Sequence, residues 1–236
     1  MNVVSLPNLR VEEPQLLARS IANNLETAII HGELPGGMRL TEEIVCQKTG
    51  FSRSPIREAL RLLENDGLLV REPRRGVRVS ELTVEELDDL YVCRISLEST
   101  AAALAVKHAS DEEISAIREA HLECERKLPP ADAREHFAAN VEMSNRLFAA
   151  AHNKPLSRLL GSIHKQALRY RFMAYETSRA VRRNSVKSNT ELIACLARRD
   201  EEGAARMARI SIECSHQVIR ECLLARSQSG GGSVSS

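Results

Sequence analysis

Hydrophobic residues recur every three or four positions through most of the chain, which is the spacing of amphipathic helices. Near the start, Leu17, Ile21, Leu25 and Ile29 follow this spacing and predict a helix over residues 14–31. The same pattern dominates everything after Thr83. There it predicts further helices over residues 83–107, 111–127, 131–151, 154–176, 185–199 and 200–225. The chain is therefore predicted to be mainly α-helical.

The segment between these helical stretches has a different pattern. Residues 42–49 predict a short helix, the turn GFS follows, and a second helix begins within SRSPIREAL. We expect Ser54 to cap this second helix and Pro55 to occupy its first position. After Gly67, two short apolar runs, 68–71 and 77–79, flank the turn sequence PRRG and predict a hairpin. This order of elements is that of a winged helix-turn-helix, in which the hairpin forms the wing.

The change of pattern near Glu81 divides the chain into domains. We expect a winged helix-turn-helix over residues 1–81 and an all-α antiparallel helical bundle over residues 82–227. The last residues, 228–236, are expected to form a disordered tail, because the terminal sequence SQSGGGSVSS is of low complexity and has little to bury.

Composition places few limits on function, but it excludes some classes. The net charge is only +1, so any surface for a polyanion must be local. The six cysteines are scattered without a CxxC pair, which is typical of reduced thiols in a cytoplasmic protein. No apolar stretch approaches the length of a membrane span, and the N-terminus lacks the layout of a signal peptide. We therefore expect a cytoplasmic protein that does not associate with membranes.

The second helix of the helix-turn-helix begins with hydroxyl groups and a cation. Free N–H groups at a helix N-terminus, together with Ser52, Ser54 and Arg53, would form an anion site that suits phosphate. The alternative is a solvated charged face, because acidic residues such as Glu58 and Glu64 dilute the basic character. The order of the elements favours a DNA-binding surface over a solvated charged face. The candidate DNA-binding residues are Ser52, Arg53, Ser54, Arg57, Arg61, Arg74, Arg75 and Gly76.

The first domain is identified by its sequence as a relative of a known family. The stretch RLTEEIVCQKTGFSRSPIREALRLLENDGLLVREPRRGVRV resembles the winged helix of the GntR family of bacterial transcription regulators. Within it, SRSPIREALRLLENDGL matches the family's SRTPVREALRRLEAEGL-type signature almost position for position. The resemblance implies that the protein binds double-stranded operator DNA as a homodimer.

The same resemblance implies roles for single residues of the DNA-binding surface. Arg53 and Arg57 would read guanine, since a guanidinium can bond O6 and N7 of that base together. Together with Ser52 and Ser54, these arginines would meet phosphates and base edges, and Gly76 would let the wing backbone approach the DNA. Arg61, further along the helix, could equally be a surface residue.

The second domain resembles the FCD domain, the ligand-binding module of the FadR-type branch of GntR regulators. Its three supporting motifs are VCRISLESTAAALA, NRLFAAAHNKPL and LIACLARRDEEGAARMA. Members of this branch mostly repress operons for the breakdown of organic acids, sugar acids and amino-acid-like compounds. The resemblance therefore implies a repressor that is controlled by a small-molecule effector, with a carboxylate as the expected chemistry.

Two charged residues of the first helix of this domain fall on its inward face. Arg94 and Glu98 share a stripe with Tyr91 and Ala101. Buried charge is costly unless it is paired or used in binding. Either Arg94 and Glu98 form a closed pair, or Arg94 anchors the carboxylate of an effector, which is the role that the family implies.

The sequence departs from the family at the positions of its metal ligands. Alignment on the motifs above places the usual Asp and three His ligands at Asn140, Ser144, Asn189 and Ser211. Amides and hydroxyls are poor ligands for a transition metal, so no metal and no cofactor are expected. We interpret the four residues as part of a polar pocket, with Arg94 and Glu98, that hydrogen-bonds its effector directly. The alternative is that they satisfy one another or hold buried water.

Two other classes of protein compete with this interpretation. An enzyme is disfavoured because the sequence contains no nucleophile elbow, phosphate-binding glycine loop, HExxH motif or cluster of metal ligands. A DNA-binding protein without a ligand remains the second alternative. The sequence does not name the effector, the operator or the target genes.

Overall fold

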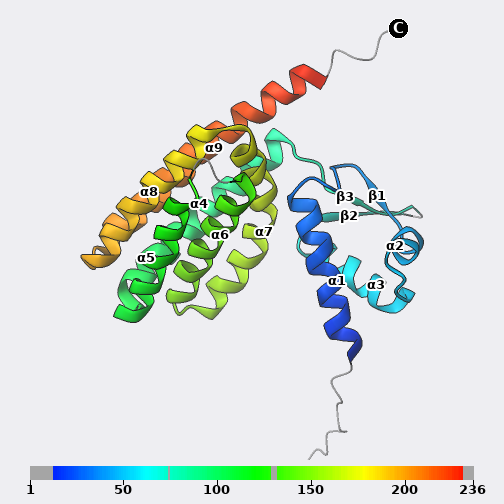
Figure 1. The fold of residues 1–236 in the computed structure, drawn as a ribbon, viewed down its shortest axis with the longest axis horizontal. Coiled ribbons are helices and arrows are strands. Elements are labelled where there is room, and N and C mark those ends of the chain that lie inside the picture. The colour runs from blue at the N-terminus through cyan, green and yellow to red at the C-terminus, as the bar shows by residue number, and fades with distance from the viewer. Residues whose placement is uncertain (1–12, 74, 129–131, 231–236) are drawn as a thin grey trace, which may run out of the picture. The chain divides into compact units, whose positions relative to one another are not determined.

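The computed structural model describes residues 13–73, 75–128 and 132–230. The chain divides into two compact units, residues 1–81 and 82–236 (Figure 1). The described chain is mainly helical, with one small sheet in the first unit. The predicted fold class, a winged helix-turn-helix followed by an all-α bundle, is confirmed. Within the described residues, no helix is both long and apolar enough to cross a membrane.

In its described residues, the first unit contains three helices and a three-stranded antiparallel sheet in the order β1-β3-β2. Its elements are α1 (Glu13–Ile30), β1 (Arg39–Leu40), α2 (Glu42–Thr49), α3 (Arg53–Asn65), β2 (Leu69–Glu72) and β3 (Gly76–Val79). The hairpin β2–β3 is the predicted wing. Strand β1 was not predicted, because the segment around it was interpreted as a turn. Two residues are too few to show the alternation of polar and apolar positions that identifies a strand.

The start of α3 differs from the expectation. Ser52, not Ser54, is the N-cap, with extended backbone angles (φ −70°, ψ 163°), and the helix begins at Arg53. Pro55 is thus the third helical residue rather than the first. A proline fits there because the N–H groups of the first helical turn have no partner within the helix.

The turn between α2 and α3 depends on a glycine. Gly50 adopts a left-handed conformation (φ 75°), and its N–H donates to the carbonyl of Cys46. At the other end of α2, the hydroxyl of Thr41 accepts from the N–H of Ile44. The apolar stripe of α3 then packs inward, with Ile56 and Leu63 fully buried. The opposite face of α3 is left to solvent.

The second unit consists of helices in its described part. They are α4 (Val84–His108), α5 (Asp111–Arg126), α6 (Ala133–Ala150), α7 (Lys154–Thr177), α8 (Arg179–Ala197) and α9 (Glu201–Gly230). Side chains cap most of their N-termini, as predicted for Thr83 at the start of α4. At the start of α5, Ser110 and Glu113 form a complete capping box.

Two helix boundaries in this unit were predicted wrongly. Helix α8 begins at Arg179 rather than at Ser185, because the hydroxyl of Ser178 caps it by accepting from the N–H of Val181. Helix α9 continues past Ala225 to Gly230, so residues 228–230 of the predicted tail are helical. Serine and glutamine have only moderately lower helix propensity than alanine, so they do not end a helix as glycine does. Residues 231–236 lie outside the described residues.

Helices α4 and α9 make the most extensive contact within the bundle. Small residues of α4, Ala101, Ala102 and Ala105, are fully buried in the core and allow neighbouring helices to approach closely. Larger side chains such as Phe172 and Ile219 fill the remaining space, and they are only 2% and 0% exposed to solvent. Charged side chains are almost never fully buried in such a core unless they are paired, so the buried ones in this unit need an explanation.

Candidate functional site

The predicted DNA-binding residues of α3 lie together on its exposed side. Ser52, Arg53, Ser54 and Arg57 are all exposed to solvent. They occupy the N-terminal part of α3, opposite the buried stripe that contains Ile56. The side chain of Ser52 makes no capping hydrogen bond, so it leaves the positive end of the α3 dipole uncapped beside Arg53 and Arg57.

Arg57 makes a paired contact with α2. Its Nε and Nη2 donate to the two carboxylate oxygens of Glu42 at 2.7 and 3.0 Å. The hydrogen bond from Arg57 holds the pKa of Glu42 below its ordinary value. The Arg57 side chain nevertheless remains 68% exposed. Exposed ion pairs contribute little to stability, so Arg57 would lose little by exchanging this carboxylate for another acceptor.

The remaining DNA-binding candidates lie at different places. Arg61 is exposed and bonds Glu58 of the same helix at 2.6 and 2.9 Å. Arg75 is exposed in the wing, and Arg74 lies outside the described residues. Gly76 has φ 90°, and a Cβ on it would lie 3.4 Å from the carbonyl oxygen of Leu40 in β1. The sheet itself therefore favours glycine at this position, whatever the wing contacts.

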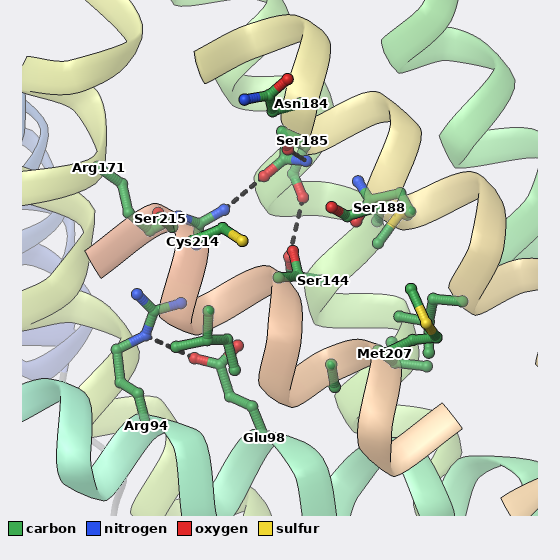
Figure 2. Close-up of a pocket in the computed structure, with 18 of the residues that line it drawn as sticks. Arg94, Glu98, Ser144, Arg171, Asn184, Ser185, Ser188, Met207, Cys214 and Ser215 are labelled. Carbon is green, nitrogen blue, oxygen red and sulfur yellow. Dashed lines mark hydrogen bonds and ion pairs between the residues drawn. The ribbon is translucent and has the colours of Figure 1, made fainter. Parts of the chain in front are cut away.

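All six residues that were predicted to bind the effector line one cavity in the second unit. The cavity has a volume of about 100 Å³ (Figure 2). A cavity with a volume of only about 10–15 Å³ is already large enough to hold one water molecule. The six residues come from four helices: Arg94 and Glu98 from α4, Asn140 and Ser144 from α6, Asn189 from α8, and Ser211 from α9.

Arg94 and Glu98 form the closed pair that was one of the two alternatives. Nε of Arg94 donates to Oε1 of Glu98 at 2.7 Å, and the two side chains are only 4% and 12% exposed. Burial alone would lower the pKa of Arg94, but the charge of Glu98 and the neighbouring Tyr91 together raise it above its ordinary value. The Tyr91 ring centroid lies 4.4 Å from the guanidinium carbon. Nη1 of Arg94 is buried without a hydrogen-bond partner, so the pair leaves one donor unused.

The four polar residues at the expected metal positions do not bond one another through their side chains within the described structure. Asn140 donates to the hydroxyl of Ser185 at 3.0 Å and accepts a short bond from Arg171. Ser144 donates to the backbone carbonyl of Asn140 in its own helix. Nδ2 of Asn189 is buried without a partner. Within the parts of the chain that the structure describes, no three His, Cys, Asp or Glu side chains gather as metal ligands do.

Several residues of the cavity wall were not predicted from the sequence. The most important is Arg171 of α7, which is 7% exposed and whose guanidinium extends toward the same part of the cavity as that of Arg94 (Figure 2). Tyr175 and Ser185 also line the cavity, and the Tyr175 hydroxyl donates to that of Ser185 at 2.6 Å. A signal for Arg171 was present in the sequence, because it interrupts the apolar run ALRYRFMAY.

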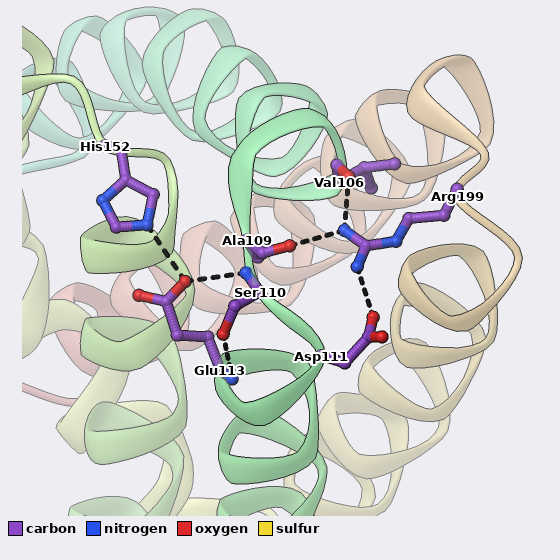
Figure 3. A network of polar contacts seen from close by, with 7 residues as sticks. All are labelled: Val106, Ala109, Ser110, Asp111, Glu113, His152 and Arg199. Carbon is purple, nitrogen blue, oxygen red and sulfur yellow. Dashed lines mark hydrogen bonds and ion pairs between the residues drawn. The ribbon is translucent and has the colours of Figure 1, made fainter.

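A separate set of polar contacts ties together the ends of helices that build this unit (Figure 3). Arg199, in the turn between α8 and α9, donates to the carbonyls of Val106 and Ala109 at 3.0 and 2.6 Å and pairs with Asp111 at 2.6 Å. It thereby satisfies carbonyl groups at the C-terminus of α4 that would otherwise lack partners. Glu113, the capping residue of α5, also bonds His152 at 3.0 Å. These contacts hold the helix ends in place, and the residues that make them do not line the cavity.

His164 of α7 lies in the core next to the cavity arginines. Burial, and after it the charges of Arg171 and Arg94, lower the pKa of His164 well below 6.5. Both of its ring nitrogens are buried without partners, and the ring packs edge-on against Phe148. His164 is therefore neutral in the folded protein at neutral pH.

A pH dependence of stability follows from His164. Its pKa is lower in the folded state than in the unfolded state, so the unfolded state binds more protons as the pH falls below 6.5. For this group the free energy of unfolding should fall by about 1 kcal/mol between pH 6.5 and 5.5, because the unfolded histidine is only about half protonated at pH 6.5. The slope approaches about 1.4 kcal/mol per pH unit only below that range. His164→Phe should remove this fall of about 1 kcal/mol, as measured by urea unfolding. His108→Phe, at an exposed position, is the control, and equal slopes for the two variants would contradict the assignment.

The fold and its two sites define a class of protein. A winged helix-turn-helix with an exposed basic helix, joined in one chain to a helical domain with a polar cavity, is the architecture of a DNA-binding transcription regulator. Comparison with known proteins agrees with this class. Residues 17–79 match the model of the gntR family of bacterial regulatory proteins, and residues 89–213 match the model of the FCD domain.

The chain belongs to the gntR family and carries an FCD domain, so the resemblance drawn from the quoted motifs is confirmed. It is 31% identical over 160 residues to the uncharacterized HTH-type transcriptional regulator YdhC of Bacillus subtilis, covering 67% of this chain and 71% of YdhC. It is 26% identical over 155 residues to the HTH-type transcriptional repressor GlaR of Escherichia coli, covering 63% of this chain and 70% of GlaR. These relatives are transcription regulators, not enzymes.

A solved structure supports the fold alone. The E. coli protein McbR/YncC superimposes with a TM-score of 0.76 at 21% identity, covering 87% of this chain and 97% of that chain.

Proposed function

We propose that this protein is a homodimeric repressor whose binding to operator DNA is controlled by a small organic acid in the cavity of the second unit. The observation that carries the proposal is the cavity itself. Six residues selected from the sequence, on four different helices, line a single polar space in the domain that matches the FCD model. A core that had no ligand would be expected to fill such positions with apolar side chains, which cost less to bury.

DNA binding is assigned to the exposed side of α3 and to the wing. In a helix-turn-helix, the N-terminal residues of the second helix contact base edges in the major groove. Here those residues are Ser52, Arg53, Ser54 and Arg57, with Arg75 of the wing as a further contact. A two-fold dimer would place two such helices on the half-sites of a pseudo-palindrome. Repression is the activity named for the relative GlaR, and it is proposed here by that similarity.

Control by an effector requires that the ligand bind one state of the protein better than another. The coupling between effector and DNA affinity is then reciprocal and typically changes affinity about 5- to 150-fold. A DNA-binding protein without a ligand would show no such coupling. An effector-controlled regulator and a DNA-binding protein without a ligand therefore differ in one measurable quantity, the change in DNA affinity when the effector is added.

The test is a selection of DNA from a random pool by the purified protein, followed by binding measurements with the selected sequence. The proposal expects enrichment of a two-fold symmetric site that is bound at least about 1,000-fold more tightly than random DNA at physiological salt. It also expects a dimer by sedimentation analysis. Binding of all sequences with equal affinity at moderate salt would reject the regulator role, because only the non-specific phosphate contribution would remain.

A further inference from the structure

We infer that the cavity takes a small monoanion and that Arg171, rather than Arg94, is the residue that balances its charge. This inference rests on the proposed function, because it names the class of effector for the same cavity. Three properties of the cavity wall support it: its net charge, its unused hydrogen-bond donors, and its apolar part.

The charge of the wall does not cancel. Arg94, Glu98 and Arg171 are the charged residues in the described lining of the cavity. Arg94 is paired with Glu98, so these two charges balance. Arg171 bonds the neutral amide of Asn140 and lies over the ring of Phe137, and no carboxylate of the described chain pairs with it. One positive charge is therefore left in a site that is largely shielded from water.

Such a charge is costly in the absence of a ligand. A buried cation that lacks an anionic partner loses hydration without regaining it from the protein. The hydrogen bond to Asn140 gives the Arg171 guanidinium an acceptor, but it contributes no opposite charge. A ligand with one negative charge would supply what the protein lacks. A second negative charge on the ligand would lie in the same small cavity as Glu98, without a second unpaired cation to balance it.

The unused hydrogen-bonding groups of the wall are donors. Nη1 of Arg94 and Nδ2 of Asn189 are buried without partners. Ser185 and Tyr175 contribute a further donor, because their hydroxyls carry two protons and the contact between them uses one. The amide of Asn140 already donates to Ser185, so no proton of these hydroxyls is needed there. A group with several acceptor oxygens, such as a carboxylate, fits this arrangement.

Part of the remaining wall is apolar and limits the size of the ligand. Met143, Leu147, Leu192 and Ile212 line the cavity, whose volume is about 100 Å³. These side chains suit a short hydrocarbon portion and would not compensate a second charged group. The cavity therefore favours a short-chain monocarboxylate over its amide, which lacks charge, and over the corresponding dicarboxylate.

The test compares matched probes at constant ionic strength by thermal unfolding of the full-length protein. The probes are acetate, propionate and butyrate, their amides, and the dicarboxylates malonate and succinate. We expect at least one monocarboxylate to raise Tm by about 5–10 °C at a hundredfold excess over its Kd. The amides and dicarboxylates should raise Tm by less than a quarter of that shift.

Three variants identify the residue that is responsible. Arg171→Met should abolish the shift caused by the monocarboxylate, and Arg171→Lys should keep part of it because the charge remains. Arg183→Met removes an exposed arginine from α8 and should respond like the unaltered protein. The shift is measured for each variant against its own Tm without probe, so a change in basal stability does not affect the comparison.

Several results would overturn the inference. They are an equal response to amides or dicarboxylates, no response to any of the monocarboxylates at about 100 mM, which is a hundredfold excess over a millimolar Kd, or a full response in Arg171→Met. None of these results would affect the selection of symmetric DNA, so failure of the monoanion site is distinguishable from failure of the regulator role.

Discussion

Replacing Arg57 with alanine is expected to weaken binding to the selected operator by about 10- to 100-fold, the effect of losing one bidentate contact to a base. Binding to random DNA should change much less, because non-specific affinity comes from phosphate contacts. The fold should be unaffected, since Arg57 loses only an exposed ion pair with Glu42. Fluorescence anisotropy with operator and random duplexes at one salt concentration measures both affinities.

Arg126 provides a matched control for this substitution. Like Arg57, it is an exposed arginine that bonds a glutamate, in this case Glu123, through Nε and Nη2 at 2.8 and 2.7 Å. It lies on α5 in the second unit, outside the winged helix-turn-helix. Arg126→Ala should therefore leave the ratio of operator to random-DNA affinity unchanged. If Arg57→Ala weakens both affinities equally, Arg57 contacts phosphate and does not read a base.

Replacing Arg94 alone is expected to destabilise the helical unit by about 3–5 kcal/mol, because Glu98 would be left as an uncompensated buried charge. The corresponding fall in Tm is roughly 6–20 °C for a chain of this length. Arg94→Met retains much of the length of the side chain while removing its charge and donors. Urea unfolding at pH 7.5, followed by circular dichroism, measures the effect on the helical unit.

The double variant Arg94→Met/Glu98→Gln separates the pair from the packing around it. Because it removes both charges together, it should be at least about 2 kcal/mol more stable than the single variant. Equal stability of the single and double variants would show that Glu98 is not an uncompensated buried charge when Arg94 is removed. In that case the contact at 2.7 Å would not be the reason for the burial of the two side chains.

The helical positions in the chain could be predicted because burial imposes a period on the sequence. The stripe of Ile56, Leu60 and Leu63 identified α3, and the same logic identified the helices of the second unit. Boundaries were less predictable where two capping residues competed. Ser52 and Ser54 both suit a cap, and only the path of the turn after Gly50 selects Ser52. Ser178 likewise starts α8, where Val181 is buried but the charged Arg182 and Arg183 that follow it obscure the apolar stripe.

The cavity was partly predictable for a different reason. Asn140, Ser144, Asn189 and Ser211 stood out as polar residues on apolar stripes, which is where a buried polar group needs an explanation. Their meeting in one place depends on how four helices pack, and periodicity alone contains no information about that. Arg171 was missed because its helix was recognised only as a helix, although an arginine within an apolar run signals a buried charge.

Ion pairs across turns were not predictable at all. Glu42 and Arg57 are fifteen residues apart, and they meet because the turn at Gly50 brings α2 against α3. The sequence contains both residues, but nothing in their spacing indicates a contact. The same holds for Arg199, whose partners are at the junction of α4 and α5.

The central claim is that an anion in the cavity controls the binding of operator DNA. The most direct test is to measure the affinity for the selected operator with and without a monocarboxylate that raises the Tm of the protein. We expect a change in affinity of at least about 5-fold, and no change in the Arg171→Met variant. An anion that stabilises the protein but leaves operator affinity unaltered would contradict the claim, because the cavity would then bind a ligand without regulating DNA binding.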